Sequence, residues 1–322
     1  MIYGILIVDK SEILEGRNRD MNFDEIAKKV EEKKDLTLDE LFELWKEAQT
    51  VEEGWEETTV PGDYSKKYRR HFTKDGIINT DTYAKADCKV LVVLKEANLE
   101  NETARAEVLG NEDDHRGFYN DFVNGDYSYD SRRVSFINAK NELENADNPS
   151  HQKELIGRMS FLLQGFSRTH KLIGMNPSVS QIQEALKGTA VINLNKRGGE
   201  KSTNNRILNK YCKKYALFIR REIEIIKPDV IVWCAWKSLG YDKLVPENIP
   251  VINMYHTAHI RMSNKQPELL KECGNRPVDQ VLKEIEAGVS TGYMAYSRHV
   301  AKYMLVFRER VREALEEGKL KL

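Results

Sequence analysis

Four short apolar runs, each followed directly by polar residues, constrain the fold more than any other feature of this sequence. They lie at 89–94, 189–195, 229–236 and 249–256, and much of the sequence between them has helical periodicity. Continuous apolar runs of this length are typical of strands that are buried on both faces of a sheet. The sequence therefore predicts an α/β fold, with a mostly parallel sheet and helices on both of its faces.

The polar ends of these runs predict where a ligand would bind. The first run continues into Lys-Glu-Ala-Asn at 95–98, the second ends near Asn193, the third ends at Trp236 and the fourth ends at His256. In open α/β sheets the ligand crevice lies outside the carboxyl ends of the strands. We therefore expect these strand ends to meet along one edge of the sheet.

Each of these polar residues has a functional and a structural interpretation. Glu96 can activate a water or stabilise a developing positive charge, but it can equally cap a helix or pair with Lys95. His256 can donate to an oxygen that gains negative charge, although a single histidine at a strand end is more often structural. Asn193 suits the edge of a pyrimidine, and such asparagines also stabilise turns. Trp236 fits either a stacking wall or the core.

Charge is distributed unevenly although the net charge is only -1. Residues 1–60 hold 8 Lys and Arg against 17 Asp and Glu, whereas residues 189–221 hold 9 basic residues against the single acid Glu200. A local basic stretch is the electrostatic signature of a protein that binds a polyanion. A solvated helix face balanced by the acidic amino-terminal segment explains the charge equally well.

The basic stretch begins with two glycines among cations, in "NKRGGEKSTNNR". Glycines allow the backbone to approach a ligand, so Lys196, Arg197, Lys201 and Arg206 are candidate phosphate contacts. The order of residues is not that of a nucleotide-binding P-loop. The sequence has no cysteine–histidine spacing typical of a metal site, so we expect no metal.

The chain divides into an amino-terminal extension and a core. Residues 18–57 predict two amphipathic helices within a helical extension at 1–70 that packs on the core. Residues 71–322 form the core domain, and the polar, irregular stretch at 99–150 is predicted to be an insertion. A single long helix is expected over 203–227, where Pro228 stops it.

Composition indicates an ordinary soluble globular protein, with 40% hydrophobic and 31% charged residues. No stretch reaches the roughly 18 apolar residues needed to span a bilayer, and the amino terminus does not have the pattern of a signal peptide. The four cysteines are scattered and form no C-x-x-C pair. We therefore expect a cytoplasmic protein with reduced thiols and no contact with a membrane.

The order of the strand ends resembles that of the uracil-DNA glycosylase superfamily. "VLVVLKEAN" stands in the place of its first motif, "AVINLNKR" is similar to its N-x-x-K segment, "IIKPDVIVWCAWKSLG" resembles its later strand-and-helix segment, and "VINMYHTAHIRMS" stands in the place of its H-P-S motif. The resemblance covers roughly residues 70 to 320. It implies a three-layer αβα sandwich around a four-stranded, mostly parallel sheet, to which the helical amino-terminal segment is an addition.

The sequence departs from the family pattern at several positions. Lys95 stands in place of the family glycine and Asn98 in place of the proline. Ala97 stands where some members carry a catalytic aspartate or asparagine, which leaves Glu96 as the acidic candidate. The clustered cysteines of the iron–sulfur branches are absent, so we expect no iron–sulfur cluster and no other cofactor.

The resemblance also implies roles for individual residues. Glu96 would place the attacking water and face the sugar cation, His256 would stabilise the departing base, and Asn193 would read the base edge. The other base-binding residues would be Ala97, Asn98 and Trp236. The DNA-binding residues would be Lys95, Lys196, Arg197, Lys201, Arg206, His259, Arg261 and Ser263, with Arg261 in the loop that wedges into the minor groove.

These expectations describe a monomeric, monofunctional DNA glycosylase that flips out uracil or a modified pyrimidine and leaves an abasic site. DNA repair and defence against phages with modified DNA are both compatible with it. The sequence leaves two rivals. One is a non-catalytic DNA-binding module with the same fold, and the other is a nucleotide-processing α/β enzyme that does not act on DNA. The target base and the preference for single- or double-stranded DNA are left open.

Overall fold

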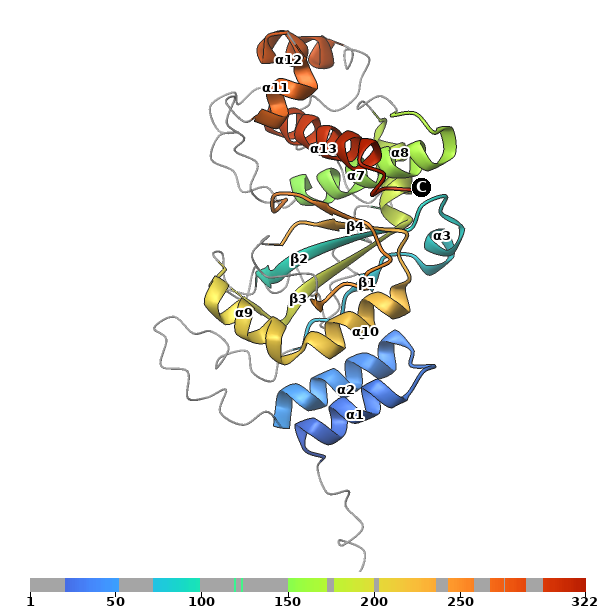
Figure 1. The fold of residues 1–322 in the computed structure, drawn as a ribbon, viewed down its shortest axis with the longest axis vertical. Helices are drawn as coiled ribbons and strands as arrows, with labels where there is room; N and C mark the ends of the chain where they lie inside the picture. Colours follow the sequence, from blue (N-terminus) through green and yellow to red (C-terminus); the bar gives the residue numbers. More distant parts are fainter. Residues whose placement is uncertain are drawn as a thin grey trace, which may run out of the picture.

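The chain is described from a computed structural model. The structure describes residues 21–51, 72–98, 119, 123, 150–172, 177–199, 203–235, 243–257, 267–274, 276–287 and 298–322. Within them a mixed, mostly parallel sheet of five strands forms the centre of an α/β fold, in the order β1-β3-β2-β4-β5 (Figure 1). The parallel strands are β2 (Val90–Asn98), β3 (Thr189–Gly199), β4 (Val230–Trp233) and β5 (Val251–Asn253).

The four parallel strands coincide with the four apolar runs, but the expected number of strands was one too low. The additional strand β1 (Gly76–Ile77) pairs antiparallel with β3 through Val191 and Ala190. The sequence Asp75-Gly76 is typical of a turn, but Gly76 is the first residue of β1, where it has a positive φ of 117°. A strand of two residues is too short to show a periodic pattern. Its formation depends on pairing with β3, which is far away in sequence.

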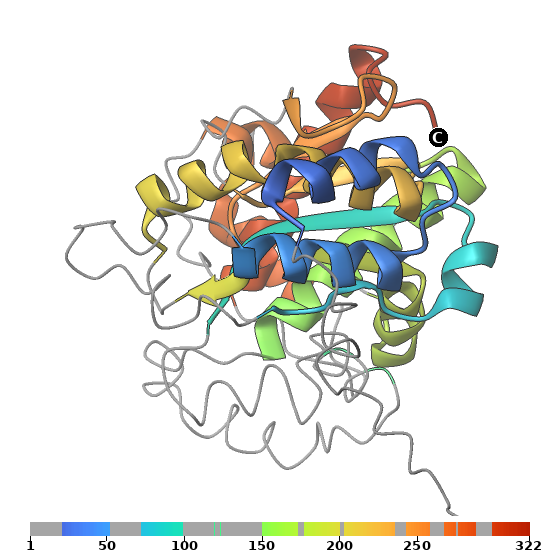
Figure 2. The same cartoon turned by 90° about the horizontal axis from the view of Figure 1, so that it is seen from below.

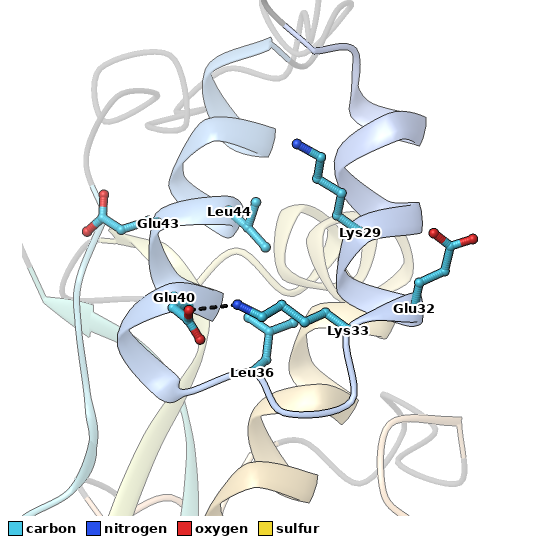
Figure 3. A pocket seen from close by; sticks show the side chains of 7 residues that line it. All are labelled: Lys29, Glu32, Lys33, Leu36, Glu40, Glu43 and Leu44. Atoms are coloured by element: carbon cyan, nitrogen blue, oxygen red, sulfur yellow. Dashed lines mark hydrogen bonds and ion pairs between the residues drawn. The ribbon is translucent and has the colours of Figure 1, made fainter.

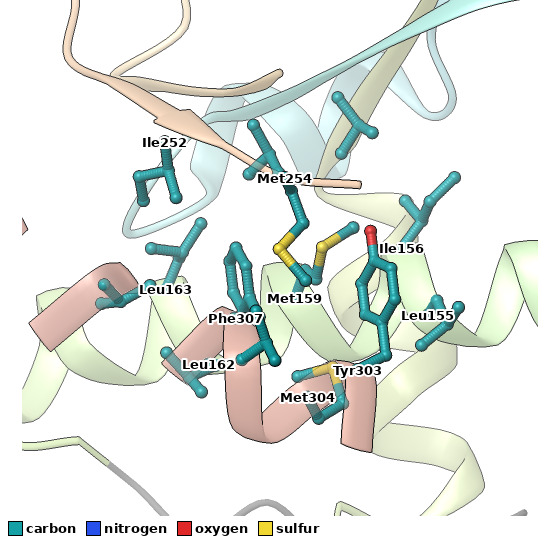
Figure 4. Close-up of a cluster of buried hydrophobic side chains, with 14 of the residues drawn as sticks. Leu155, Ile156, Met159, Leu162, Leu163, Ile252, Met254, Tyr303, Met304 and Phe307 are labelled. Carbon is teal, nitrogen blue, oxygen red and sulfur yellow. The ribbon is translucent and has the colours of Figure 1, made fainter. Parts of the chain in front are cut away.

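Strand side chains alternate between two hydrophobic clusters, one on each face of the sheet. Val90 and Val92 belong to the first cluster, and Leu91 and Val93 belong to the second. Figure 4 shows part of the first cluster, where Met254 at the end of β5 lies among Met159 and Phe307 of the covering helices. The helices that contribute to this first cluster are α7 (Ser150–Thr169), α8 (Val179–Lys187), α11 (Pro267–Cys273), α12 (Val278–Ala287) and α13 (Arg298–Glu316).

The second face is covered by helices from the amino-terminal and central parts of the chain. They are α1 (Phe23–Glu32), α2 (Leu38–Val51), α9 (Asn205–Lys214) and α10 (Ala216–Ile226), and α3 (Thr80–Lys85) precedes β2. The helices α1 and α2 lie side by side against this layer (Figures 1 and 2). Trp45 of α2 is fully buried in the second cluster, so the amino-terminal helices share the core of the sheet.

The single helix expected over 203–227 is two helices instead. α9 ends and α10 begins at Tyr215, whose φ of -100° and ψ of 20° depart from helical values. The ring of Tyr215 stacks on Trp45 at 6.1 Å and meets Tyr211 at 4.5 Å. Tertiary packing therefore decides where the helix is interrupted, and Pro228 stands just beyond the end of α10, as expected.

Candidate active site

The carboxyl edge of the sheet carries Glu96 on β2, Asn195 on β3 and, three residues beyond the end of β5, His256. Glu96 pairs with Asn195 in the parallel register, and Asn195 Nδ2 donates to Glu96 Oε2 at 2.9 Å. Val93 of β2 pairs with Trp233 of β4, and Trp233 pairs in turn with Asn253 of β5. These three residues form one row across the sheet. Glu96 and His256 each follow three residues after that row. Two strand spacings, roughly 10 Å, separate β2 from β5.

The carboxylate of Glu96 lies close to the backbone of Gly199. The register between β2 and β3 shifts after Glu96, so that Asn98 pairs with Gly199 across an irregularity in β3. A Cβ on Gly199 would lie 2.2 Å from Glu96 Cδ and 2.5 Å from its Oε1. A side chain at position 199 would force the half-buried carboxylate to move away from the backbone of β3.

Helix α13 fixes the segment that carries His256. The Tyr303 hydroxyl donates to the carbonyl oxygen of Tyr255 at 2.6 Å. Arg310 donates through Nη1 to the carbonyl oxygen of Asn253, and its guanidinium lies 4.8 Å from the ring centre of Tyr255. The half-buried His256 thus follows a backbone that two side chains of α13 hold in place.

Behind this edge lies a buried ion network centred on Lys196. Its Nζ contacts Asp75 Oδ1 at 2.5 Å and Glu222 Oε1 at 2.8 Å, and it lies 5.2 Å from the ring centre of Trp45. Burial alone would lower the pKa of Lys196, but the two carboxylates outweigh burial and raise it. Burial raises the pKa of Glu222 well above its ordinary value, although the positive charge of Lys196 opposes this rise.

The predicted phosphate contacts of Lys196 and Arg197 are wrong in this arrangement because both side chains are fully buried. Arg197 donates through Nη2 to the Tyr215 hydroxyl at 3.0 Å, and its guanidinium lies 5.1 Å from the ring centre of Tyr211. The irregularity of β3 beyond Asn195 turns consecutive side chains toward the same core. The sequence shows the cations, but it does not show the acids and aromatic rings that enclose them.

Asn193 also lies deeper than a base-reading residue at an open edge would. It is 1% exposed, its backbone nitrogen donates to Asp75 Oδ2 at 2.7 Å, and its Nδ2 donates to the same oxygen at 3.3 Å. In this structure Asn193 fixes Asp75 within the ion network. Asn195, two residues further along β3, is the amide that contacts Glu96.

The other predicted site residues have separate locations. Ala97 is buried, Lys95 is half-buried, and Arg206 is exposed in the first turn of α9. Asn98 is placed by its backbone pairing with Gly199. Outside the described residues lie Trp236, Lys201, His259, Arg261 and Ser263, together with almost all of the predicted insertion.

Two residues at this edge were not predicted as site residues. Asn195 is identified by its register with Glu96, which the spacing of the two parallel runs already suggests. Thr257 is fully buried beside His256, and its hydroxyl forms no hydrogen bond with any described residue. Buried hydroxyls nearly always have a partner, so this oxygen is a candidate ligand contact. No sequence signal distinguishes Thr257 from other residues next to a polar strand end.

Part of the predicted insertion reaches the core below this edge. Tyr119 and Val123 are buried in the first hydrophobic cluster. Burial raises the pKa of Tyr119, and the negative charge of Asp75 raises it further.

A surface groove of about 580 Å³ lies elsewhere, between α1 and α2 (Figure 3). Charged side chains dominate its lining, and Lys33 Nζ donates to Glu40 Oε1 across it at 2.7 Å. Its lining residues are Lys29, Glu32, Lys33, Leu36, Glu40, Glu43 and Leu44. None of them is a strand-end residue, so this groove is separate from the candidate active site.

The described part of the chain contains no group of three or more His, Cys, Asp or Glu residues able to hold a metal ion. None of its helices is long and apolar enough to cross a membrane. All four cysteines are free and buried. Comparisons with models of protein families, with curated proteins and with solved structures give no match for this chain.

Proposed function

We propose that this protein is a monofunctional DNA glycosylase with the three-layer αβα sandwich of the uracil-DNA glycosylase superfamily. It would flip a uracil or a modified pyrimidine into the carboxyl edge of the sheet and hydrolyse the N-glycosidic bond. The observation that carries the proposal is the pairing of Asn195 with Glu96 at the carboxyl edge of the sheet, together with His256 three residues beyond the carboxyl end of β5. Ligands of open α/β sheets bind at this edge.

The reaction requires a general base that activates the attacking water beside the sugar, and a hydrogen-bond donor beside the departing nucleobase. As the bond between C1′ and the base nitrogen breaks, positive charge develops on the sugar and negative charge on the base. Glu96 would face the sugar, accept a proton from the attacking water and so deliver hydroxide to C1′. His256 would donate a hydrogen bond to the base as it leaves. Asn195 would orient the Glu96 carboxylate through the hydrogen bond described above.

A non-catalytic DNA-binding module is the second candidate. Lys95 and Ala97 favour it, because they stand where the family has a glycine and, in some members, a catalytic carboxylate or amide. Such a module would bind DNA through the same edge without breaking a bond.

A base-excision assay distinguishes the two candidates. DNAs that differ only in one base, carrying uracil, hydroxymethylated cytosine or glycosylated cytosine, are incubated with the protein and then treated with alkali. The proposal predicts strand breaks in at least one of them, with a rate that falls about 100-fold or more in His256→Ala. Binding to DNA without strand breaks across the panel would favour the module, and an unchanged rate in His256→Ala would remove the role assigned to that residue.

A further inference from the structure

The nine cations of the basic stretch at 189–221 have three different surroundings. Lys196 and Arg197 are buried, as described above. Arg220 and Arg221 of α10 both pair with Glu224, at 3.2 and 3.3 Å. Lys201 lies outside the described residues. The remaining four, Arg206, Lys210, Lys213 and Lys214, are all exposed on α9.

Helix α9 has one apolar face and one basic face. Its sequence, NRILNKYCKK, contains no acid, and its buried residues are Ile207, Leu208, Tyr211 and Cys212. Arg206, Lys210 and Lys213 follow the spacing i, i+4 and i+7, which forms a single stripe on a helix. We call these three residues the α9 stripe. Lys214 lies beside it, 3.8 Å from the ring centre of Phe23.

No described acid neutralises the α9 stripe, which forms no ion pair within the described parts of the chain. The contrast with α13 is clear, because Arg308 pairs with Glu272 at 3.3 Å and Arg310 with Glu268 at 3.0 Å. Arg206 also lies in the first turn of α9, where the helix dipole disfavours a cation. Its position therefore does not stabilise the helix.

Helix α9 lies beside the candidate active site and carries the α9 stripe on its outer face. Helix α9 packs against β3 and lies beside the carboxyl ends of β2 and β3 (Figures 1 and 2). Burial raises the pKa of Cys212 to about 12, and the negative charge of Glu96 contributes to that rise. The apolar face of α9 is thus within electrostatic range of the Glu96 carboxylate, and the stripe lies on the opposite, exposed face.

We propose that the α9 stripe binds the phosphate backbone of the DNA strand whose base enters the candidate active site. This inference rests on the proposed function and assigns the backbone contact to α9 in place of the buried Lys196 and Arg197. From Arg206 to Lys213 the helix rises roughly 10 Å, a distance over which one DNA strand presents about three phosphates. Such contacts position the strand and do not read its sequence.

The test removes three charges and measures how salt affects binding. In the stripe variant, Arg206→Gln, Lys210→Gln and Lys213→Gln are combined, because glutamine has a helix propensity close to that of lysine and arginine. In the control variant, the exposed Lys34, Lys227 and Lys283 are changed to glutamine, which removes the same charge elsewhere. Affinity for a fluorescently labelled oligonucleotide is measured by anisotropy over a range of KCl concentrations, with single-stranded and duplex DNA.

The stripe variant should bind on the order of 100-fold more weakly near 0.1 M salt, and the slope of log affinity against log salt should become shallower by roughly 2 to 3. The control variant should behave like the unmodified protein. If the stripe variant keeps the affinity and slope of the unmodified protein, α9 does not contact the backbone, although the proposed function can stand. If the unmodified protein itself shows no salt-dependent binding to DNA, both proposals fail.

Discussion

Lys196 and Lys210 belong to the same basic stretch of sequence, yet their surroundings are opposite. Lys196 is fully buried between Asp75 and Glu222, whereas Lys210 is exposed and pairs with no described acid. The first cation contributes to the structure and the second to the surface charge. The comparison shows that a run of cations identifies a nucleic-acid interface only after the buried members have been separated from the exposed ones.

The largest effect on stability is expected from Lys196→Met. The substitution leaves Asp75 and Glu222 buried without their cation, which should lower the free energy of unfolding by about 3 to 5 kcal/mol. Substitutions in the α9 stripe should each change it by no more than about 0.5 kcal/mol. Urea denaturation at neutral pH measures both.

Two results bear on that comparison. Combining Lys196→Met with Glu222→Leu should cost less than Lys196→Met alone, because only one buried acid, Asp75, is then left without the cation. If Lys196→Met and Lys210→Gln changed stability equally, the division of the basic stretch into structural and surface cations would be wrong.

A smaller loss in the free energy of unfolding is expected from Gly199→Ala. This substitution tests whether the close contact between Gly199 and Glu96 stabilises the irregular part of β3. The added methyl would lie 2.2 Å from Glu96 Cδ, so the carboxylate or the strand must move. Overpacking of this kind costs about 1 to 3 kcal/mol. In the double variant with Glu96→Ala the methyl has room, and most of the loss should be recovered in thermal or urea unfolding. Additive losses from the two changes would refute the contact.

The smallest effect concerns the pH dependence of stability. Because burial raises the pKa of Glu222, we expect the folded protein to retain this proton at pH values above 4.5, where the unfolded chain releases it. The raised pKa therefore makes stability decrease as the pH rises from 4.5 towards the pKa of the folded state, by at most about 1.4 kcal/mol per pH unit. Glu222→Gln should remove this part of the slope in urea unfolding measured at a series of pH values. An identical slope in both proteins would mean that Glu222 is ionised in the folded state.

The sequence predicts the framework of the fold better than the details of the site. The four parallel strands were predicted because each is a continuous apolar run. β1 was not, since two residues carry no pattern of their own and depend on pairing with Val191 and Ala190. The break at Tyr215 depends on its packing against Trp45, which no local pattern reveals.

The predicted site residues divide in the same way. Glu96 and His256 were predicted from where strands end, and in the structure Glu96 lies in β2 and His256 three residues beyond β5. Lys196 and Arg197 were expected at the surface because their side-chain directions depend on the irregularity of β3, and their neighbours come from distant segments. Asn195, by contrast, was within reach of sequence reasoning once the parallel register of the two runs was considered.

The most direct test of the proposed function is the single-turnover rate of Glu96→Gln on the DNA that the unmodified protein cleaves. The matched control is Glu247→Gln, at an exposed glutamate that precedes β5 and so lies away from the strand ends. The proposed function predicts normal DNA binding by both variants and a rate of abasic-site formation at least about 100-fold lower in Glu96→Gln alone. Equal rates in the two variants would contradict the assignment of this edge as the site of base excision.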